Sequence, residues 1–306
     1  MKTIICLIIA GVTISALAQT ESLEHDWKAT LKIVNDDGNP VAGAEATVYY
    51  MLTNSIVGLT DTNGIFVAFH HDRSVDLAFQ IEKLGYYPSR MEYHLGFYYK
   101  FDKWNPVQII LLRRIGKPIP MYAKREEMKF QKEDEPIGFD LMVGDWVAPY
   151  GKGKDADMFF TIHRTIMSDR EFNADLKVTF PNKGDGIAVA PPEPVPGSEF
   201  KTSRTAVENG YESERSWHYS NSKRPESVFG YFIRVRTVLD ENGNVKSALY
   251  GKIRGDFRFY AGTKAPQAGM GFDHYLNPTP NDRNLEFDPI QNLMKNLKPL
   301  EGVDSP

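Results

Sequence analysis

The sequence predicts an all-β protein with a small N-terminal antiparallel β-sandwich, a second antiparallel β-rich domain and one short C-terminal helix. Short segments in which apolar and polar residues alternate with a period of two recur along most of the chain. Clusters of Gly, Asn, Asp and Pro separate these segments and predict turns. An apolar spacing typical of a helix occurs near the C-terminus, at residues 289–298.

The stretch 33–66 organises the first domain, for which we expect residues 27–113. It contains a turn cluster at 35–39, rich in Asn, Asp and Gly, followed by an alternating strand. Asn63-Gly64 then predicts a two-residue type I′ hairpin turn, because that turn needs positive φ at both central positions.

The rest of this domain is also predicted to be strands. Leu77, Phe79 and Ile81 alternate with polar residues, which indicates a half-buried strand. The continuous apolar run at 107–112 predicts a closing strand that is covered on both faces.

Two turn motifs in this region, DGNPVAGA at 37–44 and TDTNGIF at 60–66, flank a strand in a characteristic order. This order resembles the carboxypeptidase regulatory-like family, and the resemblance covers about residues 27–113. It implies a prealbumin-like antiparallel β-sandwich that serves as an accessory domain. The pattern contains no catalytic residue that could be carried over to this chain.

Residues 1–18 have the features of a secretory signal peptide. Lys2 precedes an apolar segment, and an A-L-A cleavage motif ends at Ala18. The apolar segment is shorter than the roughly 20 residues of a membrane-spanning helix. We therefore expect cleavage before Gln19, a polar leader at 19–26, and a mature protein that does not span the membrane.

The composition limits the cellular compartments and the classes of binding partner that we expect for the protein. The only cysteine, Cys6, lies inside the predicted signal peptide, so the mature chain would have no disulfide and no thiol nucleophile. The net charge of −4 argues against nucleic acid as a partner. We expect a bacterial protein exported to the periplasm, the cell surface or the extracellular space.

The second domain is predicted at 121–275, after a Pro- and Gly-containing linker at 114–120. Its clearest feature is a hairpin formed by strands at 228–239 and 245–260. The charged segment 122–135 reads as an exposed edge strand or arm.

The phrase GFDLMVGDWVAPYGKGK, at 138–154, resembles an uncharacterised β-rich domain that accompanies the regulatory-like module in exported bacterial proteins. The resemblance implies an architecture and supplies no activity.

The remaining residues, 276–306, form a tail that contains the predicted helix at 289–298. Asp288 can cap its N-terminus, and Pro289 suits the first helical position. One face of this helix would be apolar and would dock on the protein, through Ile290, Leu293, Met294 and Leu297.

The sequence offers little evidence for catalysis or metal binding. No histidine begins H-E-x-x-H or H-x-x-E, which a zinc peptidase would need, and G-x-S-x-G does not occur. His70 and His71 are adjacent in a predicted extended segment, so their side chains would point to opposite faces and could not share a metal ion. We predict no catalytic residue, no metal ligand and no cofactor.

The candidate ligand-binding residues are Trp146, with Asp145 and Tyr150 beside it, because an exposed aromatic ring among polar residues can stack on a sugar. We expect a non-enzymatic protein that binds a polysaccharide or a protein of the cell envelope. Two alternatives stay open: a hydrolase whose site lies in the second domain, and a structural surface or assembly subunit.

Overall fold

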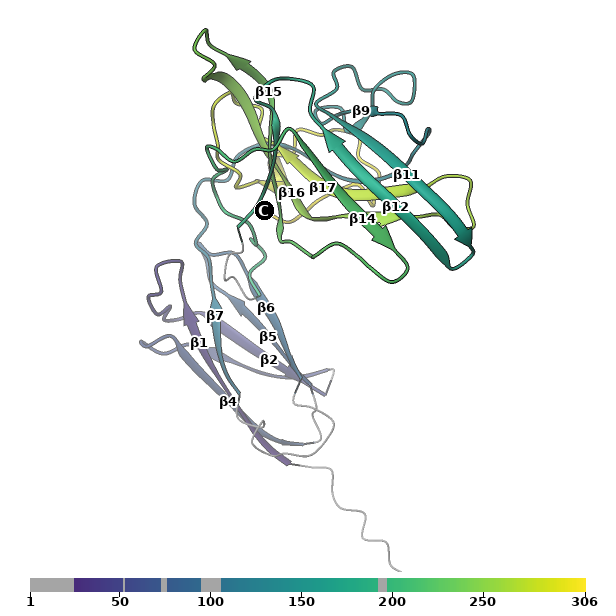
Figure 1. Cartoon of the computed structure of the whole chain (residues 1–306). Coiled ribbons are helices and arrows are strands. Elements are labelled where there is room, and N and C mark those ends of the chain that lie inside the picture. The colour runs from purple at the N-terminus through teal and green to yellow at the C-terminus, as the bar shows by residue number, and fades with distance from the viewer. Residues whose placement is uncertain (1–24, 52, 73–75, 95–105, 192–196) are drawn as a thin grey trace, which may run out of the picture.

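The computed structural model describes residues 25–51, 53–72, 76–94, 106–191 and 197–306. In these ranges the chain forms four β-sheets and a single three-residue 3-10 turn, which confirms the predicted all-β class. Figure 1 shows two lobes, with the N-terminal strands in one lobe and the C-terminus near the junction with the other. The predicted signal peptide and its cleavage site at Ala18 and Gln19 lie outside the described residues.

The first lobe is a sandwich of a three-stranded sheet, ordered β4-β1-β7, and a four-stranded sheet, ordered β3-β2-β5-β6. Its core lies between the sheets and includes Trp27, Leu31, Val48, Phe79 and Ile110. The strands are β1 (His25–Val34), β2 (Glu45–Tyr50), β3 (Asn54–Leu59), β4 (Ile65–Asp72), β5 (Asp76–Glu82), β6 (Ser89–His94) and β7 (Val107–Leu111).

The predicted hairpin at Asn63-Gly64 is wrong. Only Gly64 has positive φ, and the Asp61 side chain accepts hydrogen bonds from the backbone N–H groups of Asn63 and Ile65. The flanking strands β3 and β4 belong to different sheets, so this turn carries the chain across the sandwich. A local turn signal does not specify which strand its neighbours will join.

The closing strand β7 also differs from expectation. It pairs with β1 in parallel, and its outer face is open: Val107 and Ile109 are more than half exposed. Only the inward residue, Ile110, is fully buried. The prediction from the continuous apolar run, that both faces of this strand are covered, is therefore wrong for the outer face.

The second lobe contains two five-stranded antiparallel sheets, ordered β10-β9-β11-β12-β14 and β13-β15-β16-β17-β8. The charged segment forms an edge strand, β8, as expected, and β15 with β16 forms the predicted hairpin. The strands are β8 (Tyr122–Lys129), β9 (Ile137–Asp140), β10 (Asp145–Trp146), β11 (Met158–Ser168), β12 (Glu171–Thr179), β13 (Gly186–Val189), β14 (Glu214–Ser220), β15 (Gly230–Leu239), β16 (Val245–Tyr260) and β17 (Gly269–Leu276).

The β13-β15-β16-β17-β8 sheet is covered on both faces. An aromatic core between the two sheets covers one face and contains Phe160, Phe257 and Phe272. The C-terminal tail and the segment around Ala206 cover the other face, where Phe232 and Phe287 are buried. This double coverage explains why β16 is buried along most of its middle.

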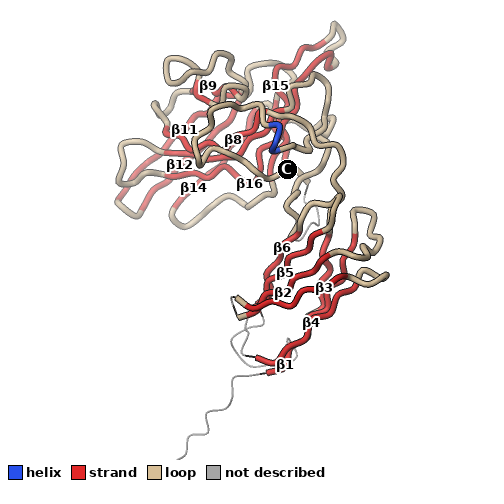
Figure 2. Tube along the Cα trace, turned by 180° about the vertical axis from the view of Figure 1, so that it is seen from behind, coloured by secondary structure: helices blue, strands red, loops and turns tan. Residues whose placement is uncertain are grey.

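The predicted helix at 289–298 is wrong beyond its first turn. Asp288 caps a 3-10 turn at Pro289–Gln291, with Pro289 in the first position. The chain then leaves helical geometry, because Asn292 exchanges hydrogen bonds with the backbone of Ala123 and the Leu293 N–H donates to the Met121 carbonyl. Pairing with the residues at the start of β8 replaces the helical hydrogen bonds. Figure 2 shows the 3-10 turn in blue, as a short segment within loop.

A polar joint connects the lobes where the segment 114–120 leads from β7 to β8. Arg113 donates to the carbonyls of Phe200 (2.9 Å) and Thr202 (2.8 Å), and its guanidinium lies 4.4 Å from the centre of the Phe200 ring. The Tyr87 hydroxyl donates to the buried Glu286 carboxylate at 2.8 Å. These charge-assisted contacts fix the two lobes to each other.

Candidate functional site

Trp146, the first candidate from the sequence, is a core residue. It is 3% exposed, and its ring lies 5.7 Å from Phe130, 5.7 Å from Phe139 and 5.8 Å from Phe160. Its indole N–H donates to the Lys129 carbonyl. The ring faces are therefore used for packing, and a stacked ligand would need the core to open.

Asp145 organises the turn that follows it. One carboxylate oxygen accepts from the Trp146 N–H and the other from the Lys152 N–H. Tyr150 is half-buried and packs against the aromatic core. The three sequence candidates are close together, and the contacts seen here are structural. Ligand binding by Asp145 and Tyr150 stays a prediction.

Two buried carboxylates flank this turn in the sequence and hold its backbone. Asp140 and Asp157 are both 2% exposed. Arg236 donates to Asp157 at 2.7 Å, and its Nη2 atom lies 3.4 Å from Asp140. Burial raises the pKa of Asp157, and the hydrogen bond from Arg236 opposes this effect. Both carboxylates also accept backbone N–H groups, so they are engaged in holding the loop.

Histidines in the second lobe do not converge on a reaction centre. His163 pairs with Asp134 and His218 pairs with Asp175, all on the exposed surface. His274 is fully buried. Among the described residues, no group of three His, Cys, Asp or Glu side chains has the arrangement of a metal site.

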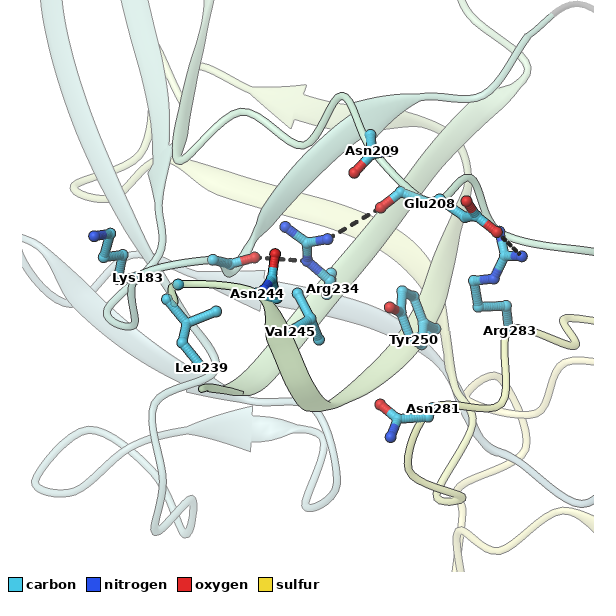
Figure 3. A pocket seen from close by; sticks show the side chains of 12 residues that line it. Lys183, Glu208, Asn209, Arg234, Leu239, Asn244, Val245, Tyr250, Asn281 and Arg283 are labelled. Atoms are coloured by element: carbon cyan, nitrogen blue, oxygen red, sulfur yellow. Dashed lines mark hydrogen bonds and ion pairs between the residues drawn. The ribbon is translucent and has the colours of Figure 1, made fainter. Parts of the chain in front are cut away.

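One hollow of the second lobe lies beside the turn between β15 and β16 (Figure 3). It has a volume of about 510 Å³. Basic side chains, amides and one carboxylate line it, together with two aliphatic residues and a tyrosine: Lys183, Arg283, Arg234, Asn209, Asn244, Asn281, Glu208, Leu239, Val245 and Tyr250.

Arg234 is held rigidly in this hollow. It donates to the carbonyls of Gly184 (2.6 Å) and Glu208 (3.1 Å), and its guanidinium lies 4.5 Å from the centre of the Tyr211 ring. Burial raises the pKa of the Tyr211 hydroxyl above its usual value, so this ring stays neutral beside the cation. The arginine is preorganised because its neighbours fix its orientation.

Arg283 and Lys183 supply the other positive charges. Arg283 donates to the Ala206 carbonyl at 2.8 Å and to the Glu208 carboxylate at 2.7 Å. Lys183 is exposed, and within the described residues its ammonium has no ion-pair partner. Three cations and one carboxylate give the hollow an excess of positive charge, although the whole chain carries −4.

This arrangement suits an anionic, polyhydroxylated ligand. Fixed cations attract carboxylate or sulfate groups, and the amides of Asn209 and Asn244 can donate to and accept from hydroxyls. Val245 and Leu239 offer apolar surface beside them. Among the described residues that line the hollow, no nucleophile stands beside a base.

Sequence reasoning missed this hollow because its residues are far apart in the chain. Lys183 precedes β13, Arg234 lies within β15, and Arg283 belongs to the C-terminal tail. Only the sequence of β15 contained a pattern that could have indicated the hollow. The period-two pattern of β15 places Arg234 on the face opposite Tyr231 and Ile233, where a charge is unexpected in a central strand.

No family model matches the chain, and no curated protein matches it. The resemblance to the regulatory-like family therefore stays a prediction.

Distant similarity to solved structures was found. The shaft pilin SpaA from Lactobacillus rhamnosus GG is 10% identical, with 75% of this chain and 87% of that chain covered and a TM-score of 0.23. BcpA, the major pilin subunit of Bacillus cereus, is 12% identical (86% and 100% covered, TM-score 0.24). A DUF3823 family protein from Parabacteroides merdae is 8% identical (86% and 98% covered, TM-score 0.22). At these TM-scores the similarities carry no argument about this chain.

Proposed function

We propose that this chain is an exported, non-enzymatic β-sandwich protein that binds an anionic polysaccharide of the cell envelope or its surroundings. The observation that carries the proposal is the hollow between Lys183, Arg234 and Arg283, a concentration of fixed positive charge on an acidic protein. Export rests on the signal-like residues 1–18. No helix in the described part of the chain is both long and apolar enough to cross a bilayer.

Binding would combine charge with hydrogen bonding. The carboxylates of successive sugar units would approach Lys183 and the outward side of Arg283, while Arg234 fixes the floor. The amide side chains at the rim, Asn209 and Asn244, would exchange hydrogen bonds with hydroxyl groups. Because the lining is exposed, affinity should fall as salt screens the charges.

The test is a calorimetric titration of the full chain with oligogalacturonate, and with the same oligomer after methyl esterification. Esterification removes the charge and adds a methyl group while leaving the sugar hydroxyls in place, so we expect at least tenfold weaker binding of the ester and a strong salt dependence for the acid. Equal binding of both forms, or no binding of the acid, would refute the proposal.

A charge reversal localises the site. Lys183→Glu places a carboxylate at the exposed rim and should weaken oligogalacturonate binding by about tenfold or more. Lys132→Glu is the matched control, because Lys132 is also exposed and lies outside the hollow. If both variants lose affinity equally, the effect comes from net charge and the hollow is not the site.

The open edge strand β3 favours a second candidate function, assembly through strand addition. Its sequence, NSIVGL, contains no charge and no proline, whereas the edge strand β8 contains five charged residues among eight. Val57 and Leu59 are 56% and 66% exposed. Uncharged, exposed edge strands are templates for pairing with another chain.

Sizing by light scattering tests assembly. If β3 pairs with another chain, the wild type should associate as its concentration rises, and Val57→Lys should abolish association. Val238→Lys is the control, since Val238 is 53% exposed but lies in β15, away from this edge. A wild type that stays monomeric at high concentration removes self-assembly as a candidate.

A further inference from the structure

A second hollow lies at the seam between the two lobes. Its floor is the outer face of β2, β5 and β6, and one wall comes from the second lobe, at Gly197 and Lys201. Its volume is about 490 Å³. The side chains that matter for recognition are one tyrosine, one amide and three charged groups: Tyr49, Gln80, Arg90, Glu92 and Lys201.

The Tyr49 ring lacks large neighbours in its own row of the sheet. Its cross-strand partners are Ser55 on β3 and Ala78 on β5. Side chains that oppose each other across a sheet are the ones that normally cover a ring, and Ser and Ala are too short to do so. Tyr49 is accordingly 37% exposed although it sits in a central strand. It is an open aromatic surface within a hollow.

Polar groups, some of them donors and some acceptors, line the same hollow as this ring. Arg90 lies opposite Gln80, and Glu92 lies opposite Ala78, the partner of Tyr49. Arginine supplies only donors, glutamate only acceptors and glutamine both. The set is therefore matched to hydroxyl groups, which also donate and accept. With two cations and one carboxylate, it carries one positive charge fewer than the hollow beside Arg234.

The wall from the second lobe is fixed against the first. The Arg90 N–H donates to the Gly197 carbonyl at 2.7 Å, and the Glu199 N–H donates to the Pro88 carbonyl at 3.0 Å. Gly197 has φ of +84°, and a Cβ there would lie 2.6 Å from the Arg90 carbonyl oxygen. Only glycine permits this approach. Because Lys201 lies on the same segment as Gly197 and Glu199, these contacts with the first lobe also set its position.

We propose that the seam hollow binds an uncharged oligosaccharide, with one sugar ring stacked on Tyr49 and its hydroxyls held by Arg90, Glu92 and Lys201. The apolar face of a pyranose is complementary to an aromatic ring, and its rim of hydroxyls is complementary to the surrounding groups. The site goes beyond the proposed function, because it uses different residues and a ligand without charge. Both lobes contribute to it, so the ligand bridges them.

The test is a titration of the full chain with three neutral probes: maltoheptaose, cellohexaose and chitohexaose. At least one should bind, Tyr49→Ala should weaken that binding by tenfold or more, and Tyr49→Phe should retain most of it. Tyr260→Ala is the matched control, because Tyr260 is 49% exposed outside the hollow. No binding of any probe, or equal binding by Tyr49→Ala and the wild type, overturns the proposal.

Hydrogen exchange of the wild type gives a second readout that needs no variant. The bound probe should slow exchange at both 88–92 and 197–201, since the site is built from both lobes. Protection confined to other segments would overturn the proposal. Lys183→Glu should leave neutral-probe binding unchanged, which separates this result from that of the anionic hollow.

Discussion

The Oε1 atom of Glu126 lies 3.5 Å from Nδ1 of His274, and both atoms are buried without a hydrogen-bond partner among the described residues. Burial raises the pKa of Glu126 to about 7 and lowers the pKa of His274 to about 4. The other imidazole nitrogen, Nε2, is 3.0 Å from the Leu141 carbonyl and must donate to it. Nδ1 is then an acceptor. The Lys124 ammonium lies 2.9 Å from the other Glu126 oxygen, Oε2, and opposes the rise in pKa. We infer that Oε1 carries a proton that faces Nδ1.

Replacing this acid by its amide tests the assignment. The folded pKa of Glu126 is raised, so the stability that its proton confers is complete below about pH 4.5 and is lost as pH rises through about 7. Glu126→Gln keeps a donor facing His274. The variant should match the wild type near pH 4.5 and exceed its unfolding free energy by on the order of 3 kcal/mol above pH 8, in urea melts.

The titration of His274 gives the unfolding free energy the opposite dependence on pH. Its folded pKa is lowered, so the unfolded chain takes up this proton below about pH 6.5 and stability falls as pH drops towards 4. Between pH 4.5 and 6.5 the two slopes offset each other, because folding moves one proton from His274 to Glu126. A steep pH dependence of stability for the wild type in this window, absent from Glu126→Gln, would contradict the shared proton.

Lys252 is a third buried titratable group whose pKa shift affects stability. Burial lowers its pKa from 10.5 to about 7, and its ammonium nitrogen is 3.3 Å from the Thr202 hydroxyl. The unfolded chain therefore binds more protons between about pH 7 and 10, and stability should rise with pH in that window. Lys252→Met keeps the aliphatic stem and should be more stable by roughly 2 kcal/mol at pH 7, with a flatter pH profile in thermal melts. A lower stability at pH 7 would show that the ammonium is needed at the joint.

Gly144 combines positive φ with a close approach. Its φ is +64°, and a Cβ there would lie 2.8 Å from both the Glu126 carboxylate and the Lys124 side chain. Gly144→Ala should cost about 2–4 kcal/mol in urea denaturation. Gly243→Ala isolates the backbone effect, because φ is +81° there with nothing within 4 Å, and should cost about 1 kcal/mol. Equal costs would remove the crowding argument.

The exposed pair of His163 and Asp134 makes a prediction for titration. The Asp134 carboxylate lies 2.6 Å from the imidazole and raises the pKa of His163. Asp134→Asn should lower that pKa, as followed by the histidine ring signals in NMR, with Asp169→Asn as a control that leaves it in place. An unchanged His163 pKa in Asp134→Asn would mean that the contact does not persist in solution.

Strand positions were predictable wherever one face is buried. Leu77, Phe79 and Ile81 were placed correctly in β5, because period-two alternation reports burial directly. The helix after Asp288 failed for a different reason. Its cap was read correctly, but the competing partner of Asn292 is Ala123, which is remote in sequence.

The candidate sites were harder to predict than the strands. Trp146 was chosen for its polar sequence neighbours, yet aromatic rings from β9 and β11 enclose it. Tyr49 lies in the strand β2, and its exposure depends on the small size of its cross-strand partners. Burial of a ring is decided by residues that the local sequence does not contain.

The central claim, a saccharide-binding protein with a cationic hollow, is tested most directly by mapping amide chemical shifts of the full chain during titration with oligogalacturonate. The account predicts changes concentrated at 183–184, 208–209 and 281–283, which diminish as salt is added. An absence of changes at these positions at saturating oligomer, or changes confined to another face, would contradict it.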